Sequence, residues 1–292
     1  MNRLAPVLLA CFVLASCSSE PQAASTTAPP AGSTTASTDS RRVDPTAGVV
    51  VSLVQVIDGD TIEVDTGTAI ESVRLIGINA PEQDECHGDT ARTALEERLH
   101  ETTITLVSGT QDDRDTFGRL LRYVIADGTD ANAQQLRDGH AFVLQTEHDR
   151  LEAYAPIAGI AAESGTGLWG TDDCGPSREE PLRIFDFDAN PPGPDDDPTS
   201  GEYVVVVRWA DGPEAWNLAG WVLRDESSIH RYEFPDIDIL PTQEYTVRTA
   251  CGTDRGFELY WCAGGPVWSN RGDTIILQDP AGNVVDHLTY RR

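Results

Sequence analysis

Regular hydrophobic patterning begins near residue 49 and predicts short strands through the first half of the chain. β-Branched and apolar residues gather there in short runs separated by turn residues, which is typical of strands. Asp58-Gly59-Asp60, for example, is a turn signal between two such runs. The expected strands are residues 49–56, 61–64, 73–78, 103–107 and 120–125.

Apolar residues at helical spacing predict helices in the same region. In the first of them, Ala91, Leu95 and Leu99 form one apolar face. Pro156 lies inside the last one and is expected to kink that helix or to end its first part. The order, with strands first and helices interleaved later, suggests a small α+β barrel with helices on one side. The expected helices are residues 89–101, 132–137 and 148–163.

A different pattern follows a stretch of loop residues between 171 and 200. Residues 190–198 contain only Asn, Pro, Gly and Asp, which favours a domain boundary. Beyond them, short apolar runs alternate with turn signals, and the sequence has no convincing helical pattern after residue 170. This pattern predicts an all-β sandwich. Its expected strands are residues 203–209, 220–223, 244–248, 274–278 and 284–290.

The N-terminus has the features of an export signal. Arg3 precedes an apolar run at residues 5–15, which is too short to span a membrane. Leu14-Ala15-Ser16-Cys17 resembles the bacterial lipoprotein box, in which the cysteine is acylated and the chain is cut before it. The resemblance implies a signal at residues 1–17 and an exported, extracytoplasmic protein anchored in the cell membrane through Cys17. An ordinary cleaved signal with a chance cysteine is the alternative.

The segment after this signal is expected to be a linker. Residues 18–46 consist largely of Ser, Thr, Ala and Pro. Such a sequence buries too little apolar surface to offset the entropy of ordering it, so it predicts a disordered tether. The first folded domain is therefore expected at residues 47–175 and the second at residues 181–292.

The charge balance limits how this protein can engage nucleic acid. The formal net charge is −27, and all 21 basic residues are arginine. Nucleic-acid binders are usually basic because phosphate contacts dominate affinity. The acidity disfavours tight, non-specific coating of DNA, and any nucleic-acid site must be local. It leaves room for an enzyme that binds, cuts and releases.

The cysteine pattern points to disulfides rather than to zinc. An even number of cysteines remains after the N-terminal segment, which in an exported chain predicts two disulfides with three possible connectivities. No spacing typical of a Cys/His zinc site occurs, so a zinc site is not expected. The four cysteines are Cys86, Cys174, Cys251 and Cys262.

Three short blocks in the first domain carry candidate chemistry. Each joins an expected strand to charged residues at its end. Two arginines, one glutamate and oxygen ligands for a hard cation are what phosphodiester hydrolysis needs. The cation and arginines neutralise the phosphate and stabilise the transition state, while the glutamate orients or deprotonates water. The blocks are Val56-Ile57-Asp58-Gly59-Asp60-Thr61, Val73-Arg74-Leu75-Ile76-Gly77-Ile78-Asn79-Ala80-Pro81-Glu82 and Arg114-Asp115-Thr116-Phe117-Gly118-Arg119-Leu120-Leu121.

In order and spacing, these blocks resemble the staphylococcal nuclease family over about residues 49–170. The resemblance implies an α+β fold, an OB-like five-stranded barrel with three helices. It also implies calcium-dependent hydrolysis of DNA and RNA that leaves 3′-phosphate ends. Among catalytic residues, it implies that Arg74 and Arg119 bind phosphate and that Glu82 is the general base or orients the attacking water.

The same resemblance implies a Ca²⁺ site with one substituted ligand. Asp60 is expected to bind calcium, with Asp58 as its supporting neighbour and Thr61 beside the site. The family's second calcium carboxylate is replaced by Asn79, and the next residue is Ala80, whose backbone carbonyl can still bind the ion. Because an amide offers an oxygen but no charge, we expect weaker calcium affinity than with aspartate.

The positions of the cysteines around this site favour one disulfide pairing. We expect Cys86 to pair with Cys174, which would tie the loop beside Glu82 to the end of the domain. Cys251 and Cys262 would then pair within the second domain. In the chain-entropy model, closing the long loop contributes about 4–5 kcal/mol.

The second domain resembles the lamin-tail domain, an immunoglobulin-like all-β sandwich, over about residues 181–292. Such a fold says little about function. A binding or positioning module and a purely structural role therefore both stay open, and its ligand is unknown. The resemblance is carried by Leu182-Arg183-Ile184, residues 190–194 and 201–205, Leu218-Ala219-Gly220-Trp221-Val222-Leu223-Arg224-Asp225, Phe234-Pro235, residues 267–274 and Leu277-Gln278-Asp279.

Together these resemblances favour a monomeric, exported, calcium-dependent nuclease that acts on DNA and RNA. The alternative is a catalytically weak cell-surface lipoprotein that binds nucleic acid or the envelope. The presence of Arg74, Glu82, Arg119 and Asp60 favours the enzyme, because a binding barrel has no need of a general base beside a metal turn. Asn79 alone favours the binding protein.

Overall fold

The computed structural model describes residues 48–109, 112–146, 148–170, 174–175, 182–227 and 229–292. All of these residues belong to one compact unit. The expected signal, the lipid site Cys17 and the expected linker at residues 18–46 lie outside the described residues. In the described part of the chain, no helix is long and apolar enough to cross a membrane.

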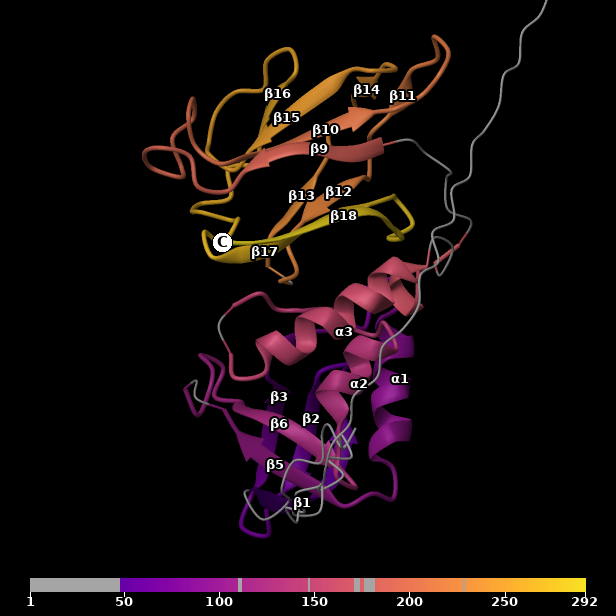
Figure 1. Cartoon of the computed structure of the whole chain (residues 1–292), viewed down its shortest axis with the longest axis vertical. Coiled ribbons are helices and arrows are strands. Elements are labelled where there is room, and N and C mark those ends of the chain that lie inside the picture. The colour runs from indigo at the N-terminus through magenta and orange to yellow at the C-terminus, as the bar shows by residue number, and fades with distance from the viewer. Residues whose placement is uncertain (1–47, 110–111, 147, 171–173, 176–181, 228) are drawn as a thin grey trace, which may run out of the picture. The chain divides into compact units, whose positions relative to one another are not determined.

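The N-terminal domain is built on a closed five-stranded barrel (Figure 1). Four antiparallel pairings join the strands in the order β3-β2-β1-β5-β6. A parallel pairing of Val73 with Leu120 joins β3 to β6 and closes the barrel. The expected OB-like barrel is thereby confirmed. Its strands are β1 (Val49–Val56), β2 (Thr61–Asp65), β3 (Ile70–Leu75), β5 (Ile104–Ser108) and β6 (Leu120–Ala126).

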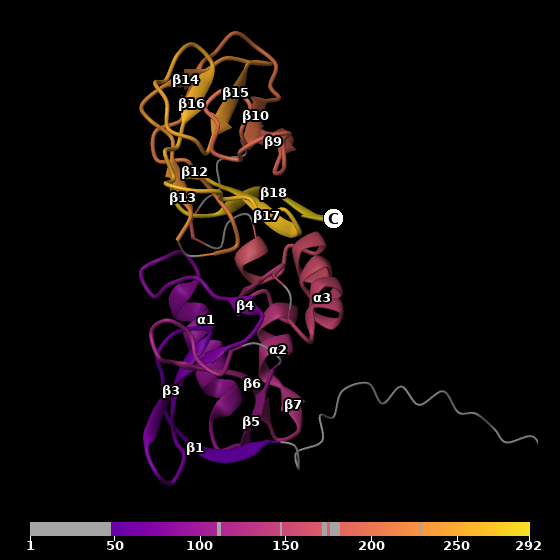
Figure 2. The ribbon, with the colours of Figure 1, turned by 90° about the vertical axis from the view of Figure 1, so that its left-hand side faces the viewer.

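Three helices cover this barrel, as expected. Figures 1 and 2 both show α2 between α1 and α3. Ala91, Leu95 and Leu99 of α1 are fully buried in the barrel core, which confirms the predicted apolar face. The helices are α1 (Gly88–Leu99), α2 (Ala131–Arg137) and α3 (Leu151–Glu163), followed by the 3₁₀ turn η2 (Gly167–Trp169). Short strands β4 (Ile78–Asn79), β7 (Thr129–Asp130) and β8 (Phe142–Val143) complete the domain.

One local expectation is wrong in this domain, and a second is narrowed. The strand expected at residues 73–78 is divided into β3 and β4, because Gly77 adopts a φ of +79° in the turn between them. The turn redirects the chain so that Asn79 pairs with Phe142 of β8 instead of continuing β3. The last helix begins at Leu151 and runs through Pro156 to Glu163, so of the two outcomes expected at the proline, an end of the helix does not occur.

The C-terminal domain consists of strands around a core of large apolar side chains, as expected for an immunoglobulin-like sandwich. Its sheets have the orders β16-β15-β10-β9 and β13-β12-β17-β18, and a two-stranded ribbon joins β11 to β14. Trp221, Leu223 and Trp268 are fully buried in the shared core. The strands are β9 (Leu182–Asp188), β10 (Tyr203–Arg208), β11 (Trp216–Asn217), β12 (Val222–Arg224), β13 (Arg231–Glu233), β14 (Asp238–Ile239), β15 (Glu244–Arg248), β16 (Glu258–Tyr260), β17 (Gly272–Gln278) and β18 (Val284–Arg291).

Two disulfides and a small cluster of apolar side chains further stabilise the two domains. Cys86 is bonded to Cys174 and Cys251 to Cys262, the two pairs that the sequence predicts. The apolar cluster combines side chains of the first domain with side chains of the second, so the described domains share a buried contact. Its buried members are Phe142, Ala161, Leu168, Trp169, Ile276 and Val284.

Candidate active site

The turn between β1 and β2 brings two acidic residues to one edge of the barrel. The backbone N–H of Asp60 donates to Asp58 Oδ1 at 2.9 Å, which shapes the turn. Gly59 is required between them, because a Cβ there would lie 2.6 Å from the Cβ of Ala80 and 2.7 Å from that of Ala91. The turn therefore packs directly against the loop after β4 and against α1.

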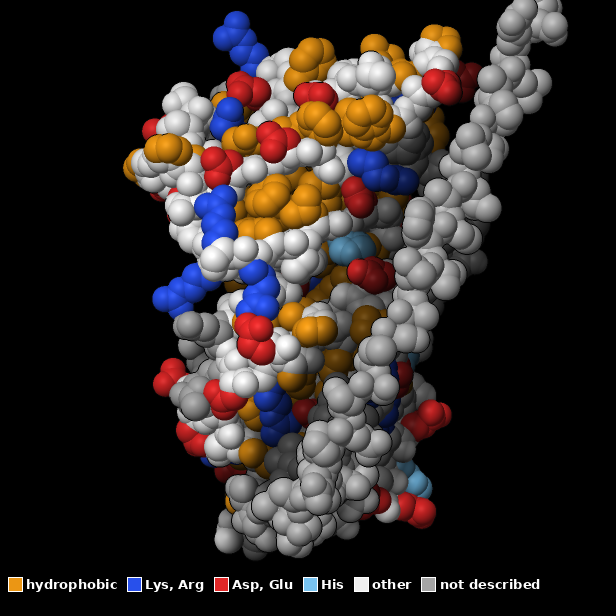
Figure 3. Space-filling view, viewed as in Figure 1, with side chains coloured by type: hydrophobic (Ala, Val, Ile, Leu, Met, Phe, Trp, Pro, Cys, Tyr) orange, Lys and Arg blue, Asp and Glu red, His pale blue; other side chains and the backbone are white. Residues whose placement is uncertain are grey.

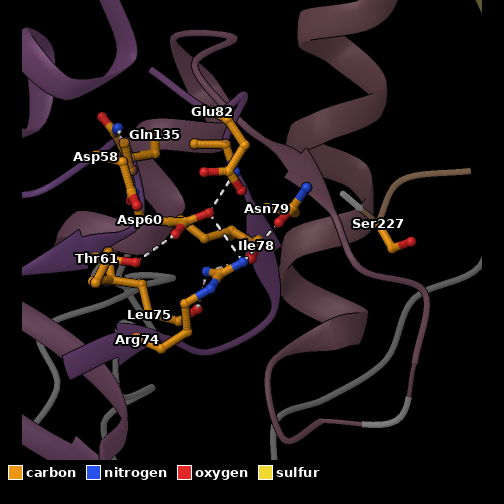
Figure 4. Close-up of polar contacts among 12 residues, drawn as sticks. Asp58, Asp60, Thr61, Arg74, Leu75, Ile78, Asn79, Glu82, Gln135 and Ser227 are labelled. Atoms are coloured by element: carbon orange, nitrogen blue, oxygen red, sulfur yellow. Dashed lines mark hydrogen bonds and ion pairs between the residues drawn. The ribbon is translucent and has the colours of Figure 1, made fainter. Parts of the chain in front are cut away.

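Asp60 is buried and holds a dense set of contacts (Figure 4). Its Oδ2 lies 3.0 Å from Arg74 Nη2 and accepts a hydrogen bond from the backbone N–H of Ala80 at 2.6 Å. Its Oδ1 accepts from the Thr61 hydroxyl at 3.0 Å. Burial nevertheless raises the pKa of Asp60 to about 7 against the opposing effect of Arg74, and the charge of Asp58 adds to the rise. The surrounding protein therefore leaves part of the negative charge of the Asp60 carboxylate uncompensated.

Arg74, at the end of β3, links Asp60 to Asn79. Its Nη2 donates to Asn79 Oδ1 at 2.8 Å, in addition to the ion pair with Asp60. Its Nη1 donates to the backbone carbonyls of Leu75 at 3.1 Å and Ile78 at 2.9 Å. These carbonyls orient the guanidinium, so the arginine is preorganised beside the two side chains expected to bind calcium.

Asn79 is buried and only partly satisfied. Its Oδ1 accepts from Arg74, while its Nδ2 has no hydrogen-bond partner among the described residues. A buried donor without a partner costs about 1–3 kcal/mol. The amide therefore replaces a carboxylate imperfectly at this position.

Glu82 follows in the loop of residues 81–87, which joins β4 to α1 and is called the Glu82 loop below. The residue is exposed, yet partial desolvation of its carboxyl raises its pKa above the ordinary value, with further rises from the charges of Asp58 and Glu85. The loop closes tightly, because a Cβ at Gly88 would collide with the Glu82 carbonyl. Figure 4 shows Glu82 gathered with Asp58, Asp60 and Asn79.

Arg119 joins the site from the start of β6. Its Nη1 lies 3.5 Å from the Thr61 hydroxyl, which itself bonds Asp60, so Thr61 connects the second arginine to the acidic turn. Its Nε donates to Asp115 Oδ2 at 2.6 Å. The guanidinium also lies 5.4 Å from the ring of Phe117, whose side chain is 84% exposed. All the residues that the sequence predicts for this site thus lie on adjoining elements.

Comparisons with known proteins agree with this geometry. A model of staphylococcal nuclease homologues matches residues 72–171. An uncharacterized endonuclease of Escherichia coli is 31% identical over 122 residues, which are 41% of this chain and 77% of the relative. Endonuclease YncB of Bacillus subtilis is 34% identical over 101 residues, which are 32% of this chain and 48% of the relative. The chain belongs to the staphylococcal nuclease family.

A second match covers the other domain of this staphylococcal nuclease family member. A model of the lamin tail domain matches residues 176–292, which confirms the predicted arrangement of a nuclease domain followed by a lamin-tail domain. The nuclease match begins at residue 72, after Asp58 and Asp60. These two residues are tied to the matched region by the contacts of Asp60 with Arg74 and Ala80.

The oxygen donors of the nuclease domain fit a hard cation. Asp60 supplies a carboxylate, Asn79 an amide oxygen and Ala80 a backbone carbonyl, and such oxygens are the ligands that calcium prefers. In the part of the chain described here, no three His, Cys, Asp or Glu side chains gather to hold a metal, so this mixed set is the candidate. The incomplete neutralisation of Asp60 is the feature that a cation would relieve.

Sequence reasoning missed one residue that shapes the nuclease site. Gln135 of α2 is fully buried, and its Nε2 donates to the backbone carbonyls of Gly59 at 2.9 Å and Ala91 at 3.0 Å. It thereby holds the acidic turn against α1. The only signal in the sequence is a glutamine among the apolar positions of a short helix, which is too common to single out.

Proposed function

We propose that this protein is an exported, calcium-dependent nuclease that hydrolyses phosphodiester bonds in DNA and RNA and leaves 3′-phosphate ends. The observation that carries the proposal is the position of Arg74, which contacts Asp60 and Asn79 at once. The Arg74 guanidinium, which can bind phosphate, therefore lies against both the Asp60 carboxylate and the Asn79 amide oxygen. Family membership supports the reaction class, since the E. coli and B. subtilis relatives are named endonucleases.

In this proposal, each charged side chain has a separate task. Arg74 and Arg119 bind the scissile phosphate and stabilise the charge that develops on its oxygens. Asp60, Asn79 and the carbonyl of Ala80 would hold calcium, which neutralises the phosphate when bound. Glu82 accepts a proton from the attacking water, because a carboxyl with a raised pKa is a stronger base than an ordinary one.

The surface charge is consistent with a local substrate site. On the face shown in Figure 3, arginine side chains lie among Asp and Glu side chains. With a net charge of −27, long-range attraction for nucleic acid is weak. Substrate binding would therefore depend on Arg74, Arg119 and the cation, and the nuclease would release its products readily.

Export and lipid anchoring through Cys17 are part of the proposal. Their support is the lipoprotein-like sequence before Cys17 and the two disulfides of the folded domains. Disulfides persist mainly in oxidising compartments outside the cytoplasm. Labelling cells with a radioactive fatty acid, beside a Cys17→Ala variant, tests the anchor; label retained in the variant would exclude it.

The second candidate is a catalytically weak binding protein of the cell surface. Asn79 is the observation that favours it, because the amide lacks the negative charge of the family's carboxylate and leaves its Nδ2 without a partner in the described residues. A cation held weakly would still allow phosphate to bind through the arginines, with little hydrolysis.

A nuclease assay on the protein without its first 46 residues separates the two candidates. We expect calcium-dependent cutting of DNA and RNA that a chelator abolishes. Glu82→Ala should lower the rate by about 10²–10⁴-fold and Arg119→Ala by at least about 10²-fold. Binding of oligonucleotides without cutting at millimolar calcium would instead favour the surface-binding protein.

A further inference from the structure

The lamin-tail domain contacts the Glu82 loop through one acidic residue. Glu85 lies in this loop, and its side chain is largely buried. Its Oε1 lies 2.6 Å from Nη1 of Arg231, in β13 of the lamin-tail domain. Arg224, at the end of β12, approaches the same carboxylate at 3.4 Å. Two arginines of the second domain therefore hold one carboxylate of the first.

Hydrogen bonds connect Glu85, which the two arginines hold, to the backbone of Glu82. Its Oε2 accepts a hydrogen bond from the backbone N–H of Glu82 at 3.2 Å. Its own N–H donates to the Glu82 carbonyl at 2.9 Å, which closes the turn in the other direction. The position of the Glu82 main chain is thus defined by the side chain that Arg231 and Arg224 hold.

The two arginines differ in how firmly they are fixed. The Arg224 side chain is 1% exposed and donates to the carbonyls of Asp225 at 3.1 Å and Ser227 at 2.7 Å. Its guanidinium lies 5.5 Å from the ring of Phe142 in β8, the strand that pairs with Asn79. Arg224 is therefore a rigid anchor, whereas Arg231 is 38% exposed and can be replaced without opening the core.

A cleft of about 520 Å³ lies beside this contact and is lined by Glu82, Glu85 and Arg231, among others. Arg231 thus faces the same space as the proposed general base. It could act on the substrate directly or through Glu85, and these two roles differ in kinetics. A substrate contact changes KM, whereas displacement of the base changes kcat.

We propose that Glu85 is a positioning residue of the nuclease, and that the lamin-tail domain sets the position of Glu82 by holding Glu85 with Arg231 and Arg224. In this proposal the lamin-tail domain supports the position of a catalytic residue and is not only an appended module. This inference rests on the proposed role of Glu82. A small displacement of a catalytic group can lower the rate by up to about 10²-fold, so a contact at this distance from the chemistry has a measurable effect.

The test compares two arginines that bridge the domains at different places. Arg231→Ala removes the stronger contact to Glu85, while Arg291→Ala removes a matched, exposed contact to Glu152 of α3, at 2.5 Å. We expect kcat to fall about tenfold in Arg231→Ala, with KM and calcium affinity unchanged. Arg291→Ala should cut at the wild-type rate, and both variants should keep the wild-type melting temperature within a few degrees. Arg231→Lys should restore most of the lost rate, and Glu85→Gln should resemble Arg231→Ala.

Three outcomes would overturn the inference. They are an unchanged kcat in both Arg231→Ala and Glu85→Gln, an equal loss in Arg231→Ala and Arg291→Ala, and a raised KM at unchanged kcat. The last result would make Arg231 a substrate contact. Failure of the proposed function is distinguishable from all three, because the wild-type protein would then show no calcium-dependent cutting.

Discussion

Asn79 carries an amide where the staphylococcal nuclease family has a second calcium carboxylate, and its surroundings define what this exchange changes. Its oxygen is bound to Arg74 at 2.8 Å, and its Nδ2 is buried without a partner among the described residues. An aspartate would add a negative charge beside Asp60 and would replace the unpartnered N–H groups by an acceptor. It would also attract Arg74 more strongly, which opposes release of the side chain to calcium.

We therefore expect the Asn79→Asp variant to bind calcium more tightly than the wild type. The gain should be smaller than for a carboxylate that has no ion pair with an arginine. The expected gain is about three- to tenfold in Kd, since the new ion pair with Arg74 offsets part of the added charge. Titration calorimetry with Ca²⁺ alone measures this without relying on activity. Asp60→Asn is the matched control and should weaken binding. An Asn79→Asp variant with wild-type calcium affinity would mean that residue 79 is not a ligand.

For the helices and strands, the sequence predicts features that depend on residues close together in the chain. It misses features that depend on contacts between distant segments. The strand at Val49–Val56 and the buried face of α1 follow from apolar spacing alone. Strand β9 (Leu182–Asp188) falls within the predicted boundary at residues 171–200, because the loop residues after it dominate that stretch of sequence. The family resemblance identifies the charged residues of the site. The hydrogen bond from Arg74 to Asn79, however, depends on a turn that the apolar pattern of the sequence does not reveal.

That turn lies at Gly77, where the expected strand is broken. Gly77 has a φ of +79°, and a Cβ at this position would collide with the ring of His148. The break lets Ile78 and Asn79 pair with β8 and places Asn79 beside Arg74. A single glycine in an apolar run therefore decides the geometry of the candidate metal site.

We expect Gly77→Ala to lower the free energy of unfolding by about 2–4 kcal/mol, from backbone strain and from the displaced imidazole. Gly67→Ala is the matched control, because Gly67 has a φ of +81° but no atom within 4 Å of the added Cβ. The control should lose only about 1 kcal/mol. Urea unfolding of both variants measures the difference. Equal losses would show that His148 moves aside at no cost.

At the scale of the whole molecule, two carboxyl groups stand out in the contact between the domains. Glu226 is buried and accepts hydrogen bonds from the backbone N–H of Gln145 at 2.9 Å and of Thr274 at 2.6 Å. Gln145 belongs to the nuclease domain and Thr274 to the lamin-tail domain, so this carboxyl joins them. Burial, together with a hydrogen bond to Glu226, raises the pKa of its neighbour Asp273 far above the ordinary value. No sequence pattern reveals such a pair, because its members lie far apart in the sequence and become neighbours only when the lamin-tail domain is folded.

This pair predicts how stability depends on pH. An unfolded aspartate ionises near pH 4, whereas folded Asp273 keeps its proton to much higher pH, so the native state binds the extra proton over the interval between. The contribution of Asp273 to the free energy of unfolding therefore falls as pH rises from about 5 to 9. Asp273→Asn keeps a donor for Glu226 but cannot ionise, and we expect its stability relative to the wild type to increase steadily over this range. Urea unfolding at roughly pH 5, 7 and 9 measures the difference. Parallel pH slopes for the two proteins would mean that Asp273 is already ionised in the native protein, and that the hydrogen bonds of Glu226 hold the two domains without a shared proton.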